Sequence, residues 1–177
     1  MSAARQAPER RGGPYARLWD RPGYLVRRLH QIHVALFLEE CAGSNITPVQ
    51  FGLLSVLAEG EALDQRALGA KIGIDRTNVA DVLARLEAHG LVERSVNPAD
   101  RRMKLTSLTP AGRDFVGHLQ ASMERAQERL IAPLDEAERQ QFLGFLHRLV
   151  AANNETGRAT LSADLGGGAD RGTRPSW

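Results

Sequence analysis

The sequence predicts a mainly α-helical fold with one small β-hairpin. Apolar residues recur every three or four positions through most of residues 24–153, which is the period of an amphipathic helix. Two short stretches, residues 91–96 and 104–109, alternate instead in the manner of β-strands. Thr47 and Thr109 are each followed by proline, a pair that marks a helix start because the threonine caps the helix and proline fits its first turn.

Length and composition limit the chain to one folded domain with tails. Its 177 residues are 42% hydrophobic, which is enough for a single core. No apolar stretch approaches the roughly 20 residues needed to cross a bilayer, and the charged first residues lack the apolar centre of a secretory signal. A single cysteine, Cys41, can form no internal disulfide and no cysteine-built metal cluster. We therefore expect a cytoplasmic protein that contacts no membrane and carries no cofactor.

Glycine, proline and the apolar pattern divide the chain into parts. The expected parts are a disordered basic arm (1–22), a folded domain (23–153) and a disordered C-terminal tail (154–177). Inside the folded domain, long helices over residues 23–43 and 110–153 are expected to flank a central lobe over residues 47–109.

The central lobe is expected to hold two consecutive helices joined by a tight turn. Asp64 and Asp75 are placed to cap their starts, while Gly73 and Gly90 are placed to end them in the left-handed conformation. The two strands follow directly, with residues 97–102 as the loop between them. The order is helix, turn, helix and hairpin.

The second of these helices carries side chains that suit DNA on its outward face. These residues are Arg76, Thr77, Asn78, Asp81 and Arg85. Arginine can pair with guanine through two hydrogen bonds, asparagine can do so with adenine, and threonine can contact a phosphate or a thymine methyl group. Ordinary exposed helices also carry such residues, so the helix alone does not decide the function.

The hairpin loop adds a concentrated positive charge. The whole chain has a net charge of only +2, but residues 94–113 hold five basic side chains and one acidic one. Arg101 and Arg102 lie at the loop, where they suit the negative potential of a DNA minor groove. Because an unpaired carboxylate facing phosphates would oppose binding, we expect Asp100 to pair with one of these arginines and orient it. An ordinary polar hairpin is the alternative.

In order and spacing these segments resemble the multiple antibiotic resistance regulator (MarR) family. The matching runs are TPVQFGLLSVL, LEAHGLVER, NPADRR and LTPAG, within a resemblance that covers about residues 24–153. The resemblance implies a winged helix-turn-helix regulator, most often a repressor, whose first and last two helices interlock with those of a second copy. By position it places Arg76, Thr77, Asn78 and Asp81 near the bases of double-stranded DNA and Arg101 or Arg102 in the minor groove. The remaining residues expected at the DNA surface are Asp64, Gln65, Arg66, Asp75 and Arg85.

The apolar content of the end helices also predicts a homodimer without that resemblance. These helices are more apolar than a small lobe could cover, so they need one another or a second chain. Two-fold symmetry then predicts a pseudo-palindromic operator with half-sites about one helical turn apart.

The resemblance further implies a small aromatic, anionic effector bound between the end helices and the lobe. The candidate residues combine cations with aromatic rings, which suits an aromatic acid or its thioester. They are Tyr24, Arg27, Arg28, His30, His33, Phe37 and Phe51. The alternative is that the arginines are solvated and that His33 is a hydrogen-bonded core residue.

Other functions have weaker support in the sequence. His30 and His33 could supply half of a metal site, but a third ligand is missing unless His118 provides it, so no metal site is predicted. Cys41 lies near a helix C-terminus, where the dipole raises the pKa of a thiol and disfavours redox sensing. No phosphate-binding glycine loop or nucleophile elbow indicates an enzyme. A ligand-independent or redox-sensing regulator, or a winged-helix module for an acidic protein partner, remains the alternative.

Overall fold

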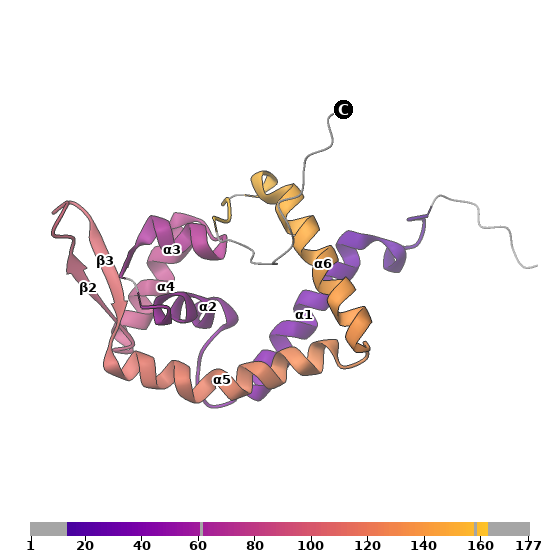
Figure 1. Cartoon of the computed structure of the whole chain (residues 1–177), viewed down its shortest axis with the longest axis horizontal. Helices are drawn as coiled ribbons and strands as arrows, with labels where there is room; N and C mark the ends of the chain where they lie inside the picture. Colours follow the sequence, from indigo (N-terminus) through magenta and orange to yellow (C-terminus); the bar gives the residue numbers. More distant parts are fainter. Residues whose placement is uncertain (1–13, 61, 158, 163–177) are drawn as a thin grey trace, which may run out of the picture.

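The computed structural model describes residues 14–60, 62–157 and 159–162. The helices are η1 (Leu18–Asp20), α1 (Pro22–Glu40), α2 (Pro48–Ala58), α3 (Gln65–Ile72), α4 (Arg76–Ala88), α5 (Pro110–Ile131), α6 (Glu136–Asn153) and η2 (Asn154–Thr156). The strands are β1 (Leu63–Asp64), β2 (Val92–Val96) and β3 (Lys104–Leu108). Figure 1 shows that α2, α3, α4 and the sheet gather at one end of the long helix α5, while α6 continues from its other end. None of the helices in the described part of the chain has the length and hydropathy to cross a bilayer.

The local signals in the sequence fix the helix ends of the lobe. The Oδ1 atom of Asp64 accepts hydrogen bonds from the backbone N–H groups of residues 66 and 67, at 2.7 and 2.9 Å. Asp75 caps α4, and Thr47 forms a reciprocal capping box at the start of α2. Gly73 and Gly90 have φ values of 70° and 69°, which glycine adopts without strain. The expected starts and stops of these helices are confirmed.

The sheet has one strand more than the sequence pattern predicts. Strands β2 and β3 form the expected antiparallel hairpin, with Val92 opposite Leu108 and Val96 opposite Lys104. Strand β1 pairs with the other edge of β3, so the order is β1-β3-β2. Because β1 is only two residues long, it has no alternation that a sequence pattern could reveal.

The core is centred on α2, α3 and α4 and extends to α1, the sheet and α5. The fully buried side chains include Leu53 and Leu54 of α2, Leu68 of α3, and Val79 and Leu83 of α4. The buried positions of α4 recur at helical spacing, so their burial fixes the rotation of the helix about its axis.

The start of α5 is fastened to the turn between α4 and β2. The hydroxyl of Thr109 donates to the carbonyl oxygen of Gly90 at 2.7 Å and accepts from the backbone N–H of Gly112 at 3.0 Å. The backbone N–H of Thr109 donates to the carbonyl oxygen of Leu91 at 3.1 Å. Gly112 is buried against that same carbonyl, which leaves no room there for a side chain.

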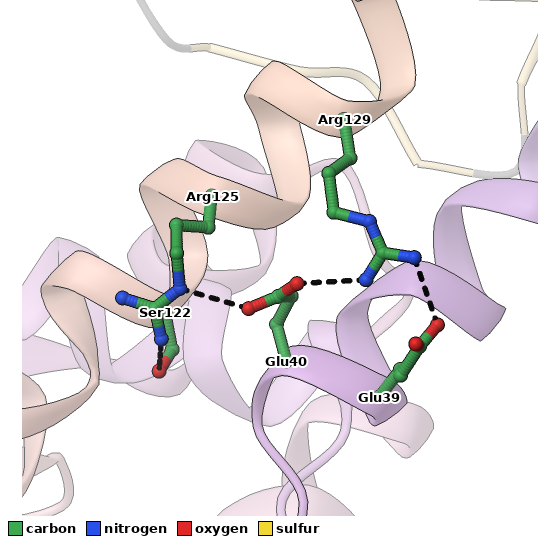
Figure 2. Close-up of polar contacts among 5 residues, drawn as sticks. All are labelled: Glu39, Glu40, Ser122, Arg125 and Arg129. Carbon is green, nitrogen blue, oxygen red and sulfur yellow. Dashed lines mark hydrogen bonds and ion pairs between the residues drawn. The ribbon is translucent and has the colours of Figure 1, made fainter.

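An ion-pair network joins the end of α1 to α5, as Figure 2 shows. Glu40 accepts from Arg125 at 2.9 Å and from Arg129 at 2.7 Å, and Arg129 also donates to Glu39 at 3.0 Å. Arg125 is held in turn by the hydroxyl of Ser122, at 2.8 Å. The hydrogen bonds from Arg125 and Arg129 hold the pKa of Glu40 below its ordinary value.

Both boundaries of the folded domain need correction. The first described part of the expected arm contains η1, and α1 starts at Pro22, where proline suits the first helical turn. Residues 1–13 of that arm lie outside the described residues. The expected disordered tail is also wrong for its first residues, because Asn154 and Leu161 bond to each other and Ser162 bonds to α3. Composition alone could not reveal these contacts with a distant helix.

We expect Gly112→Ala to destabilise the fold by about 1–3 kcal/mol, because a methyl group would collide with the backbone at Leu91. Urea unfolding followed by circular dichroism measures this change. Gly117→Ala on the same helix is the matched control, since a Cβ there meets nothing within 4 Å. The control should stabilise the protein by up to about 1 kcal/mol through helix propensity. Equal effects of the two substitutions would contradict the proposed close contact.

We expect Glu40→Gln to lower the free energy of unfolding at pH 7, and to do so more than Glu39→Gln, because Glu40 binds two arginines and Glu39 one. A lowered pKa in the folded state stabilises the fold above the ordinary glutamate pKa of 4.5, and this contribution is lost as the pH falls below it. The difference between wild type and Glu40→Gln should therefore shrink between pH 7 and pH 4 in urea titrations. A difference that stays constant over this range would refute the role of the carboxylate charge.

Candidate nucleic-acid interface

The outward face of α4 presents the polar residues that the sequence analysis assigned to DNA. Arg76, Thr77, Asn78, Asp81 and Arg85 are all exposed. The opposite face, formed by three apolar side chains of the same helix, is buried in the core. The helix therefore offers a polar surface whose direction is set by packing.

Three of the expected DNA-facing residues have structural roles in this surface. Asp75 accepts from the backbone N–H of Asn78 at 3.1 Å and from its side-chain amide at 2.6 Å. Asp64 is occupied as the cap of α3, and the side-chain amide of Gln65 donates to the carbonyl oxygen of Arg76 at 2.7 Å. Their contacts hold the starts of α3 and α4 together and restrain Asn78.

The wing is the hairpin of β2 and β3, and its tip is the loop over residues 97–103. Side chains of this loop bond to its own backbone and shape it. The side chain of Asn97 accepts from the N–H of Ala99 at 2.9 Å, and that of Asp100 accepts from the N–H of Arg102 at 3.0 Å. The expected contact of Asp100 with an arginine is made through the backbone N–H of Arg102, so the carboxylate holds the turn that carries Arg102. Arg101 and Arg102 remain exposed, so the turn presents both to solvent.

A basic hollow of about 380 Å³ lies between the helix-turn-helix and the wing. Its lining residues are Asp64, Gln65, Arg66, Arg76, Leu83, Arg94, Arg102, Met103, Lys104 and Thr106. Five of them are cations, while the one acid, Asp64, already caps a helix. The hollow is therefore suited to a polyanion.

Arg94 and Lys104 also belong to this surface, although the sequence indicated them only as members of the basic cluster at residues 94–113. Arg94 lies opposite Thr106 in the sheet and is mostly covered, and its Nε lies 3.3 Å from a carboxylate oxygen of Glu87. Its Nη2 atom is buried and has no hydrogen-bond partner among the described residues. Val92 and Arg94 share the inward side of β2, so an arginine at an inward strand position was a signal that could have been used.

The expected effector residues are not brought together in the described chain. Phe37 and Phe51 are only 0% and 5% exposed and pack edge to face in the core, with ring centroids 6.2 Å apart. Their assignment to a binding pocket needs correction, since the core requires both rings. The guanidinium carbon of Arg27 lies 5.4 Å from the ring centroid of Tyr24, and Arg28 donates a hydrogen bond to Gln31 on the same helix.

The histidines of α1 lie side by side, with ring centroids 6.4 Å apart. Burial and the neighbouring His30 lower the pKa of His33 below its ordinary value. The lowered pKa favours the neutral form of His33. Within the described residues, no group of three histidine, cysteine or acidic side chains is placed to hold a metal ion.

Cys41 is buried at the end of α1. Burial and the adjacent Glu40 raise the pKa of its thiol, which disfavours the reactive thiolate.

A second hollow, of about 300 Å³, lies where α2 and the loop before it meet α5, the end of α4 and the turn that follows α4. It is lined by Ser44, Asn45, Ile46, Gln50, Leu86, His89, Leu91 and Phe115. None of the seven expected effector residues is among them.

Comparison with known proteins agrees with this architecture. Residues 44–103 match the MarR family. A putative transcriptional regulatory protein for the hcr operon of Thauera aromatica is 33% identical over 111 residues, which are 63% of this chain and 67% of the relative.

Two solved structures are similar to this chain over nearly their whole length. BpsR of Bordetella bronchiseptica, whose DNA binding is regulated by 6-hydroxynicotinic acid, is 34% identical with a TM-score of 0.73, over 77% of this chain and 97% of its own. The repressor CouR bound to a 23-mer DNA duplex is 28% identical with a TM-score of 0.72, over 77% of this chain and 96% of its own. This chain belongs to the MarR family of winged helix-turn-helix transcriptional regulators.

Proposed function

We propose that this protein is a homodimeric repressor that binds a pseudo-palindromic operator and is released from it by a small aromatic acid or its thioester. The observation that carries the proposal is the joint surface of α4 and the wing, where a polar helix face, two exposed arginines and the basic hollow adjoin. The neighbours that bind DNA and an aromatic acid support both halves of the proposal.

In the proposed complex α4 enters the major groove and the wing tip reaches the adjacent minor groove. The strand of phosphates between two adjacent grooves would then cross the basic hollow that separates α4 from the wing. Arg66 and Lys104 are exposed there and can approach phosphates. Phosphate contacts of this kind set the position of the protein, while base contacts by α4 set its sequence preference.

The end helices supply the proposed dimer interface. No residue of α6 is buried in the single chain. Phe145 and Leu149 of α6 are 53% and 56% exposed, and Val26 of α1 is 59% exposed. Monomers rarely leave so many large apolar side chains on neighbouring turns in water, so a second copy covering them is the favoured arrangement.

The proposed effector site lies on α1 and depends on that second copy. Arg27, Arg28 and His30 are exposed cations or potential cations on one helix, next to the partly covered Tyr24. A partner helix laid against them would supply the missing wall of a pocket. The buried Cys41, with its raised pKa, gives no support to the alternative of a redox sensor.

We expect Arg102→Ala to weaken binding to the operator about tenfold or more and to reduce the salt dependence of binding by about one phosphate contact. The operator is first selected from a random duplex library, and affinity is then measured by fluorescence anisotropy at several salt concentrations. Arg102→Lys is the control that keeps the charge, so it should retain the salt slope while losing part of the affinity.

Asn78→Ala tests the role of α4 separately. We expect it to relax the base preference at one position of each half-site while leaving the salt slope unchanged, because it removes a base contact and no charge. Library selection repeated with this variant measures the preference. Unchanged affinity and preference in both Arg102→Ala and Asn78→Ala would contradict the assigned interface.

We expect 6-hydroxynicotinic acid or benzoic acid to raise the melting temperature of the protein and to weaken its operator binding in the same concentration range. Benzamide, which has a similar shape without the charge, is the control and should do neither. Arg27→Gln should reduce the shift, because the carboxylate loses a cation. If neither acid alters stability or DNA affinity, the effector half of the proposal is wrong, while the DNA half stands.

A further inference from the structure

The chain that follows α6 returns to the helix-turn-helix. The side-chain amide of Asn154 makes two hydrogen bonds to the backbone of Leu161. Its nitrogen donates to the carbonyl oxygen of Leu161 at 2.8 Å, and its oxygen accepts from the N–H of Leu161 at 2.8 Å. The backbone N–H of Ser162 then donates to the carbonyl oxygen of Ala70 at 2.7 Å. We name these three residues, Asn154, Leu161 and Ser162, the C-terminal strap.

The strap meets α3 where the helix runs into the turn before α4. The last carbonyl groups of a helix have no partner within the helix, and Ser162 satisfies the one at Ala70. The side chain of Leu161 covers Gly73, with its Cδ1 atom 3.5 Å from where a Cβ of that glycine would lie. Gly73 is the left-handed residue that ends α3 and turns the chain toward α4. The strap therefore contacts the turn that sets the angle between α3 and α4.

The strap forms a second connection between the end helices and the DNA-facing lobe. Along the chain, α6 is joined to the lobe through α5, whose first turn is fastened to the end of α4. The strap joins the other end of α6 to the end of α3. Figure 1 shows this return of the chain from α6 towards α3.

We propose that the C-terminal strap positions the recognition helix α4, and that Asn154 is the positioning residue, because it holds Leu161 and Ser162 against the α3–α4 turn. Asn154 is not among the residues that line the basic hollow, and its proposed effect runs through the turn. The consequence for DNA affinity rests on the proposed function, whereas the effect on the turn does not.

Hydrogen exchange of the full chain, measured by mass spectrometry, tests the effect on the turn without DNA. In Asn154→Ala we expect the amides of Gly73 and Ile74 to exchange about fivefold faster or more, because the turn loses the contacts that restrain its local opening. Asn153→Ala is the matched control: among the described residues, the Asn153 side chain bonds to Leu149 within α6, at 2.8 Å, and to no residue of the turn, so exchange at the turn should stay at the wild-type rate. Ser162→Pro removes the donor to Ala70 and leaves α6 intact. It should accelerate exchange at the turn as Asn154→Ala does, and it provides the test if Asn154→Ala folds poorly.

Operator affinity of the same variants tests the effect on DNA. We expect Asn154→Ala and Ser162→Pro to raise the dissociation constant about threefold or more, with α6 helicity unchanged by circular dichroism, and Asn153→Ala to leave it unchanged. Wild-type exchange at the turn in both strap variants would overturn the proposal. Faster exchange with unaltered operator affinity would overturn the positioning role. If the wild type binds no operator at all, the proposed function fails, and the exchange rates still decide whether the strap holds the turn.

Discussion

The whole DNA-facing surface depends on the burial of one side of α4. Val79, Leu83 and Leu86 have almost no exposed surface and pack against leucines of α2 and α3. Burial of each such side chain stabilises the fold by about 1.5–3 kcal/mol, so a rotated α4 that exposed them would be strongly disfavoured. The outward direction of Arg76 and Asn78 is therefore a consequence of apolar packing on the far side of the same helix.

Directional contacts then hold the rest of the lobe around α4. Asp75 and Gln65 fasten its first turn, and the Thr109 hydroxyl fastens the turn after its last residue to α5. Because α5 also carries the arginines that bind Glu39 and Glu40 of α1, a continuous series of bonded elements connects α1 to α4. Such a connection is what a regulator needs if an effector on α1 is to change the spacing of two recognition helices.

The charged side chains of this molecule have two different roles, and the fold places them in different regions. Between α1 and α5, Arg125 and Arg129 pair with Glu39 and Glu40 and brace the fold. At the hollow beside the wing, the cations outnumber a single acid that is already engaged in a helix cap. Apart from Arg94, which pairs with Glu87, the cations of the hollow are exposed and can meet phosphates. A count of charges along the sequence cannot separate these groups, since the distinction depends on which glutamates lie within reach.

The local elements follow from the sequence itself. Thr47, Asp64, Asp75 and the left-handed glycines Gly73 and Gly90 mark helix ends by short-range hydrogen bonds and backbone freedom, which act within a few residues and so leave a readable pattern. The polar face of α4 follows from the helical spacing of its apolar residues, and the arginines of the wing follow from the polar loop between two alternating strands. The tertiary structure alone decided what depends on distant neighbours: the pairing of β1 with β3, the burial of Phe37 and Phe51, and the return of Leu161 to Gly73. Each of these joins residues that are far apart in the chain or sit among side chains from several elements, and the free energy of such contacts comes from packing that no local pattern encodes.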